Sequence, residues 1–248
     1  MTDFAVAISD KMDYIGVILP TLLSGAWVTT KLFVLTLILS LPLGLVIALA
    51  SISKIAPFRW ISKLYIWIFR GTPLMLQLFF FYFFIPIGMG IALSAFATSV
   101  LTFVLNYAAY FAEIYRGGIE SIDRGQYEAA KSLGLSKSQT MFGIILPQTI
   151  KRIMPAISNE AIVLVKDTAL AFSISVAELL KAANSAMNRD QDVTAFVLAA
   201  LMYLAMTFVL TVISDALEYK YSKHEVQDHD KKKPLIHRLL AKEASHGR

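Results

Sequence analysis

Three long apolar runs without a single charged residue constrain this chain more than any other feature. They cover residues 32–53, 71–112 and 193–214. A helix needs about 20 apolar residues to cross the roughly 30 Å hydrocarbon core of a bilayer. The first and third runs have about this length, and the second is about twice as long. Because 56% of the residues are hydrophobic and only 17% are charged, the composition also predicts a membrane protein.

The spacing of apolar residues predicts an all-α, polytopic fold with five transmembrane helices. Span 1 covers 32–53 and begins near Trp27, and residues 71–112 hold spans 2 and 3 with a turn at 85–90. Span 4 is expected between Pro155 and Val176, and span 5 over 193–214. The earlier apolar run at 14–30 contains Pro20 and Gly25, so we expect it to form an interfacial helix that joins span 1.

Lysine and arginine residues predict the orientation of these spans. They are concentrated between spans 1 and 2 and between spans 3 and 4, which the positive-inside rule assigns to the cytoplasm. The N-terminus is then outside and the C-terminus inside. The same rule explains the basic balance of the chain without nucleic acid. The basic residues of the two segments are Lys54, Arg59, Lys63 and Arg70, then Arg116, Arg124, Lys131, Lys137, Lys151 and Arg152.

The expected domain organisation has three parts. Residues 1–26 form an extracytoplasmic segment with the interfacial helix, and residues 27–217 form the transmembrane domain. A polar insert at 120–150 belongs to this domain, and residues 218–248 form a charged cytoplasmic tail.

The polar insert carries two sets of helix-capping residues. Asp123 with Gln126 matches a capping box, which predicts a helix over 124–133 that stops at Gly134 in the left-handed conformation. Ser136 with Gln139 repeats the pattern and predicts a second helix through Leu146, ending before Pro147. Small residues beside Glu128 would let a partner approach closely, but an ordinary amphipathic connector fits the pattern equally well.

The insert resembles the EAA loop of ABC transporter permeases. The hallmark residues of that loop are Glu128, Ala129, Ala130, Gly134, Leu146 and Pro147. The segments 69–74, 112–119 and 164–168 further resemble the polar amino acid uptake family, the His/Glu/Gln/Arg/opine type. The resemblance covers about residues 15–220.

This resemblance implies a permease subunit of a binding-protein-dependent importer with the type I ABC importer permease fold, in the bacterial cytoplasmic membrane. Its implied partners are two ABC ATPase subunits, a second permease subunit, identical or a paralogue, and an extracytoplasmic amino acid-binding protein. The EAA loop would couple the ATPases to alternating access of the pore. The partner ATPases would bind ATP and Mg, so this chain is expected to hold no cofactor or metal and to be no enzyme. Consistent with this division, the sequence contains no Gly-x-x-x-x-Gly-Lys-Ser/Thr phosphate loop.

Ionisable residues within the predicted spans indicate a substrate pathway. Glu160, Lys166 and Asp167 lie in span 4, where charges are costly unless they face protein or water. The two acids would attract an ammonium group, and Lys166 would hold a carboxylate or neutralise an acid. An ion-pair network that joins helices explains these residues equally well.

On span 3, Asn106, Tyr110 and Glu113 share one helical face and could line the same route. Glu113 could instead pair with Arg116, one turn further along the helix.

Other functions remain as alternatives. An ABC importer of another small solute would share every feature above. A secondary transporter would often show internal repeats, and none is visible. An intramembrane enzyme would need a nucleophile and a base, yet the chain has no cysteine and no histidine before His224, which leaves only a serine with Lys166.

Overall fold

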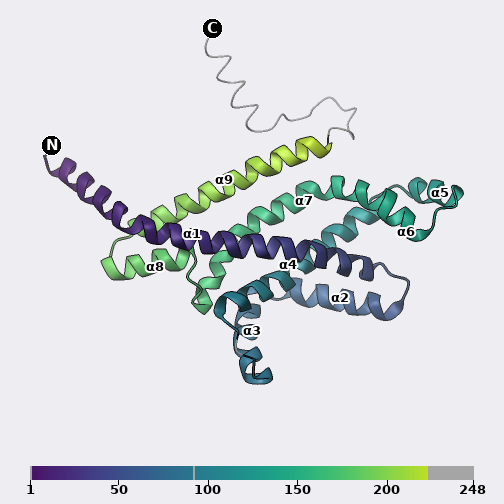
Figure 1. Cartoon of the computed structure of the whole chain (residues 1–248), viewed down its shortest axis with the longest axis horizontal. Coiled ribbons are helices and arrows are strands. Elements are labelled where there is room, and N and C mark those ends of the chain that lie inside the picture. Colours follow the sequence, from purple (N-terminus) through teal and green to yellow (C-terminus); the bar gives the residue numbers. More distant parts are fainter. Residues whose placement is uncertain (1, 92, 223–248) are drawn as a thin grey trace, which may run out of the picture. The chain divides into compact units, whose positions relative to one another are not determined.

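The computed structural model describes the backbone of residues 2–91 and 93–222, and the side chains of residues 11–91 and 93–219 (Figure 1). Every regular element in these ranges is a helix, which confirms the all-α prediction. The α-helices are α1 (Thr2–Ser51), α2 (Ala56–Gly71), α3 (Leu74–Met89), α4 (Ala95–Glu120), α5 (Arg124–Ser132), α6 (Lys137–Thr140), α7 (Leu146–Asp167), α8 (Leu179–Asp190) and α9 (Thr194–Ser222). A π-helical turn, η1 (Met141–Ile145), precedes α7, and a 3-10 segment, η2 (Thr168–Ile174), follows it.

The chain divides into two compact units, and each is described by itself. Unit 1 consists of Met1–Leu39, Gly71–Asn106 and Val163–Thr207. Unit 2 consists of Ser40–Arg70, Tyr107–Ile162 and Phe208–Arg248. Four helices, α1, α4, α7 and α9, are shared between both units, and α2 contributes only its last residue, Gly71, to unit 1.

Three described helices are long and apolar enough to cross a membrane. They contain the segments Lys11–Ser51, Ala95–Glu120 and Thr194–Tyr219, and α2 with α3 meets the same test as one broken span. In the part of the chain that the structure describes, α7 does not meet it. The reason is composition, because this helix includes Lys151, Arg152, Glu160, Lys166 and Asp167.

The first helix differs from the sequence prediction. Pro20 and Gly25 were expected to interrupt it, but α1 continues without a break from Thr2 to Ser51. Its apolar segment of 41 residues would be about 60 Å long at 1.5 Å per residue, twice the hydrocarbon thickness. Ile18 and Leu22, on either side of Pro20, are buried against other helices of unit 1, and this packing offsets the cost of a proline within a helix.

Two further boundaries differ from the prediction. The connection expected at 54–70 is mostly helix α2, whose exposed side chains include Trp60 and Trp67. Span 3 was expected to end at Ala112, but α4 continues to Glu120. Of the charged tail predicted at 218–248, residues 218–222 belong to α9, and the rest lies outside the described residues.

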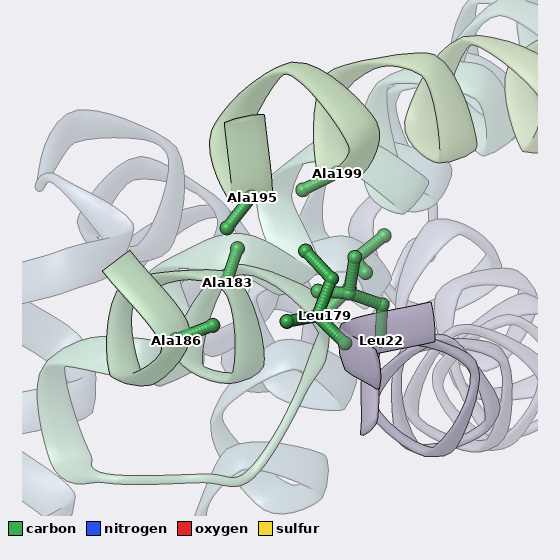
Figure 2. Close-up of a cluster of buried hydrophobic side chains, with 7 residues drawn as sticks. Leu22, Leu179, Ala183, Ala186, Ala195 and Ala199 are labelled. Carbon is green, nitrogen blue, oxygen red and sulfur yellow. The ribbon is translucent and has the colours of Figure 1, made fainter. Parts of the chain in front are cut away.

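Small residues bring three helices of unit 1 close together. Leu22 of α1 and Leu179 of α8 meet among alanines of α8 and α9, as Figure 2 shows. A methyl group added at Gly25 would lie 2.9 Å from the Cα atom of Leu179 and 3.0 Å from the Cβ atom of Ala182. Helices in membranes often pack through such small residues, because these let the backbones approach. The alanines of the cluster are Ala183, Ala186, Ala195 and Ala199.

A buried carboxylate joins the same three helices. Glu178 is fully buried and caps α8 by accepting hydrogen bonds from the N–H groups of Leu180 (2.8 Å) and Lys181 (2.7 Å). The hydroxyl of Tyr203 in α9 donates to the same carboxylate at 2.7 Å, and the N–H of Leu179 donates to Thr29 of α1 at 3.2 Å. Burial raises the pKa of Glu178, although these hydrogen bonds oppose the shift.

The close approach at Gly25 predicts that a methyl group added at this position lowers the stability of the protein, whereas one added at Gly16 of the same helix does not. We expect Gly25→Ala to destabilise the protein by about 1–3 kcal/mol, because the backbone of α8 must move. Gly16→Ala is the matched control, since nothing lies within 4 Å of a methyl group there. It should be neutral or stabilising by up to about 1 kcal/mol, as expected for alanine in a helix. Thermal unfolding in detergent compares the two, and equal midpoints would contradict the packing described.

The raised pKa of Glu178 predicts a pH-dependent stability. A carboxyl group whose pKa is higher in the folded than in the unfolded state stabilises fully below its ordinary value of 4.5. That contribution is lost as the pH rises through the folded pKa. We expect the unfolding midpoint of the wild type to fall by about 2–4 °C relative to Glu178→Gln between pH 4.5 and pH 8. An unchanged difference between the wild type and Glu178→Gln would show that the folded pKa is not raised.

Candidate functional site

The polar insert of unit 2 forms two short helices that lie side by side, α5 and α6 (Figure 1). Asp123 caps α5 by accepting a hydrogen bond from the N–H of Gly125 at 2.6 Å. The prediction of a complete capping box is wrong. The side chain of Gln126 accepts a hydrogen bond from Gln148 instead of one from the backbone N–H of Asp123. The helix ends at Ser132, one residue before the predicted end.

A left-handed glycine ends α5, as the sequence predicted. Gly134 has a φ of 74°, and its N–H bonds to the carbonyl of Lys131 at 3.0 Å. The N–H of Leu135 bonds to the carbonyl of Ala130 at 3.1 Å, and the two bonds together make a Schellman motif. The chain therefore reverses direction with its last helical carbonyls satisfied.

The second helix begins as predicted but does not end where expected. Ser136 and Gln139 form a complete capping box at the start of α6. Instead of stopping before Pro147, the helix widens into η1 and continues directly as α7. Pro147 therefore lies within a continuous helix, directly after the π-helical turn, although it offers no backbone N–H. The N–H of Leu146 bonds to Met141 five residues back, as in a π-helix.

Apolar packing and polar contacts fix the insert to the helices before and after it. Ile145 of η1 is buried with Ile119 and Ile122 at the end of α4. The guanidinium of Arg152 in α7 donates to the backbone carbonyl of Ser121, and Gln148 donates to Gln126 at 3.1 Å.

Gly118 lets α4 and α7 approach closely within unit 2. A methyl group added there would lie 2.2 Å from Ile153 and 2.8 Å from Thr149. The insert, the end of α4 and the start of α7 are therefore packed tightly together.

The predicted coupling residues do not all face the surface. Glu128, Ala129, Gly134 and Pro147 are exposed. Ala130 is only 1% exposed and Leu146 only 8%, so these two pack inside the insert. The expectation that Ala130 offers a small side chain to a partner is therefore wrong for this residue. Two exposed apolar side chains, Leu133 (77%) and Phe142 (56%), were not singled out from the sequence.

The predicted pathway residues are divided between the two units. Unit 1 contains Asn106, Lys166 and Asp167. Asn106 is buried in α4, and its amide donates to Gln77 of α3 at 3.0 Å. Gln77 in turn donates to the hydroxyl of Thr72 at 2.8 Å. Lys166 is exposed and Asp167 half-buried at the end of α7.

Unit 2 contains Tyr110, Glu113 and Glu160. Glu113 accepts two hydrogen bonds from Arg116, at 2.9 and 2.7 Å, and lies 3.4 Å from Arg70. Arg70 also stacks over the ring of Tyr110, with 5.3 Å between its guanidinium carbon and the ring centroid. The pairing of Arg116 with Glu113 that the spacing suggested is therefore present.

Three polar residues of these clusters were missed from the sequence. Arg70 was counted only among the basic residues of the segment between spans 1 and 2, and neither Gln77 nor Glu178 was singled out. Glu178 precedes α8 as a capping residue, and this position is a signal that could have identified it.

Comparisons with known proteins agree with this geometry. The sequence profile of the family described as "Binding-protein-dependent transport system inner membrane component" matches residues 40–223. The L-cystine transport system permease protein TcyB of Bacillus subtilis (strain 168) is 37% identical over 207 residues, covering 83% of this chain and 88% of that protein. The arginine transport system permease protein ArtQ of the same organism is 38% identical over 208 residues, covering 84% and 95%.

Solved structures show the same fold. A chain from a structure described as "Crystal structure of an amino acid ABC transporter with histidines" superposes with a TM-score of 0.76 at 35% identity, covering 81% of this chain and 94% of that one. A chain of the MetNI methionine ABC transporter in an inward-facing conformation gives a TM-score of 0.71 at 16% identity, covering 82% and 97%, and supports the fold alone.

Members of this family are subunits of transporters rather than enzymes. The fold, the capped insert and the identity over most of each relative agree with one another. The chain therefore belongs to the binding-protein-dependent inner membrane components, among the amino-acid ABC transporter permeases.

Proposed function

We propose that this chain is the permease subunit of a bacterial importer that carries polar amino acids across the cytoplasmic membrane by alternating access. It works with two ABC ATPases, a second permease subunit and an extracytoplasmic amino acid-binding protein. The observation that carries this proposal is the insert at 120–150, which is capped at both helices and continues into α7. Transporters of L-cystine and arginine among the relatives support a polar amino acid as cargo.

The proposed topology has five spans, with the N-terminus outside and the C-terminus in the cytoplasm. The spans are α1, the broken pair α2 with α3, α4, α7 with η2, and α9. Length and apolar composition support four of these spans. We include α7 as the fifth although it contains charged residues, because a helix that lines a substrate pathway carries polar side chains. The domain limits at 27–217 and the cytoplasmic tail at 218–248 remain part of this proposal.

The ATPases would contact this chain, and so be coupled to the transport pathway, at the exposed surface of the insert. Glu128, Leu133 and Phe142 offer a carboxylate beside apolar side chains to the ATPase. The Schellman motif and the capping box hold this surface stiffly, and η1 joins it to α7 without a flexible link. At 1.5 Å per residue, the 22 residues of α7 carry a displacement over about 33 Å to Asp167.

Substrate would pass along α4 and α7. In this proposal Glu160 and Asp167 attract the ammonium group, while Lys166 holds the carboxylate or neutralises an acid. Asn106, Tyr110 and Glu113 line the same route. The partner ATPases supply ATP and Mg, since the described insert offers a docking surface and the sequence no phosphate loop.

The left-handed conformation of Gly134 gives a test of coupling. We expect Gly134→Val to lower ATPase activity stimulated by the loaded binding protein about tenfold, because a β-branched residue costs roughly 1–2 kcal/mol in this conformation. Gly134→Asn is the matched control, since asparagine adopts the conformation more readily, and it should stay within about threefold of the wild type. Nothing lies within 4 Å of a Cβ atom added at Gly134, so the comparison tests the backbone conformation.

Wild-type stimulation in the Gly134→Val complex would contradict the proposed role of the insert. Uptake by the purified chain without any ATPase would overturn the importer assignment itself.

The charged residues of α7 give a test of the cargo. In proteoliposomes with the whole transporter, Glu160→Gln and Asp167→Asn should each reduce uptake about tenfold or more, as expected when a hydrogen bond to a charged group is lost. Basal ATP hydrolysis and the thermal unfolding midpoint should change little, and Lys151→Gln serves as a charge control on the same helix. Equal loss of stability and uptake would identify a structural ion-pair network instead. If no polar amino acid stimulates hydrolysis through the binding protein, the proposed cargo is wrong.

A further inference from the structure

A large hollow lies in unit 2 beside the insert, and none of the proposed coupling or pathway residues lines it. Its volume is about 1170 Å³, and residues from the ends of α1 and α4 and from α5, α6 and η1 line it. Part of its lining is apolar, formed by Leu49, Ile52, Ile119, Ile122 and Met141.

Basic side chains surround this apolar lining. Four of them, Lys54, Arg124, Lys131 and Lys137, line the hollow with a single acid, Glu120. That acid already pairs with Arg116, which lies outside the lining, at 2.6 Å. Within residues 11–91 and 93–219, none of the four cations has an ion-pair partner. The hollow therefore carries positive charge that the described chain does not neutralise.

The hollow also lies where two candidate membrane spans end. Leu49 and Ile52 are at the end of the segment Lys11–Ser51, and Ile119 is at the end of Ala95–Glu120. Phospholipid headgroups lie at this depth, where acyl chains meet water. Basic pockets between membrane helices at such a boundary bind anionic headgroups.

From this arrangement we propose that the hollow binds one anionic phospholipid. The phosphate contacts the four basic side chains, and the first part of the acyl chains packs on the apolar lining. A free phosphate would satisfy the cations but leave the isoleucines and Met141 uncovered. A phosphatidylcholine would cover the apolar lining but place its own cation among the basic groups.

This site is separate from the surface proposed for ATPase coupling. Glu128, Ala129, Leu133 and Phe142 do not line the hollow. Leu135, Ser136, Thr140 and Met141 do line it, which means that a bound lipid contacts the insert itself. The lipid would join the insert to the ends of α1 and α4, and would thereby stabilise the helices that transmit motion.

The test is a titration of the delipidated transporter, with its ATPases, by phosphatidylglycerol and by phosphatidylcholine with the same acyl chains. Native mass spectrometry measures the lipid bound to each complex. We expect phosphatidylglycerol to bind at least about tenfold more tightly. Lys54→Gln with Lys137→Gln should weaken it about thirtyfold, since each cation near an anionic headgroup contributes roughly a factor of five. The matched control, Lys63→Gln with Lys151→Gln, should change binding less than about threefold, because neither residue lines the hollow.

Four outcomes would overturn the proposal. They are equal binding of the two lipids, equal loss in the control variant, complete displacement by millimolar glycerol phosphate, and absence of lipid binding to the complex that contains the ATPases although the chain without them binds it. The third would identify a site for a free anion, and the fourth a surface that the ATPase covers. Because Lys137 belongs to the insert, Lys54→Gln alone provides a variant outside it, and it should weaken binding about fivefold.

Discussion

In the hydrocarbon core of a bilayer, each backbone N–H and C=O group must find its partner within the protein. This constraint explains why every regular element of the described chain is a helix. With lipid around them, packing distance rather than exclusion of water determines how well helices associate. Gly25 of α1 and Gly118 of α4 lie where another helix passes so close that a methyl group would collide. The helices of each unit are therefore joined at their closest points by residues with almost no side chain.

Two polar clusters within the packed helices are hydrogen-bonded internally, one at Glu178 and one at Asn106. Glu178 is buried yet accepts hydrogen bonds from two backbone N–H groups of α8 and from the hydroxyl of Tyr203, which offset part of the cost of burying a carboxylate. Asn106 and Gln77 pair in the same way between α4 and α3. Such pairs specify which faces of apolar helices meet, because a rotated helix would leave one partner unsatisfied.

The capped insert and α7 form one mechanical element with two kinds of surface. The outer surface of the insert has exposed apolar and acidic groups, and the residues lining the hollow bring basic groups together. Since η1 continues as α7, no flexible linker separates the insert from the helix that carries the proposed pathway residues. A partner on the outer surface and a lipid in the hollow would therefore act on the same helix, one by moving it and the other by stabilising its start.

Local chemistry was sufficient to predict the membrane class, the helix that starts at Asp123, the left-handed turn at Gly134 and the capping box at Ser136, because each depends on residues only a few positions apart. Tertiary structure alone decided the rest. The helix continues through Pro147 after the π-helical turn η1, and Ala130 is buried within the insert, where α5 contacts α6 and η1. Contacts between residues far apart in the chain determine burial, and no local pattern contains them.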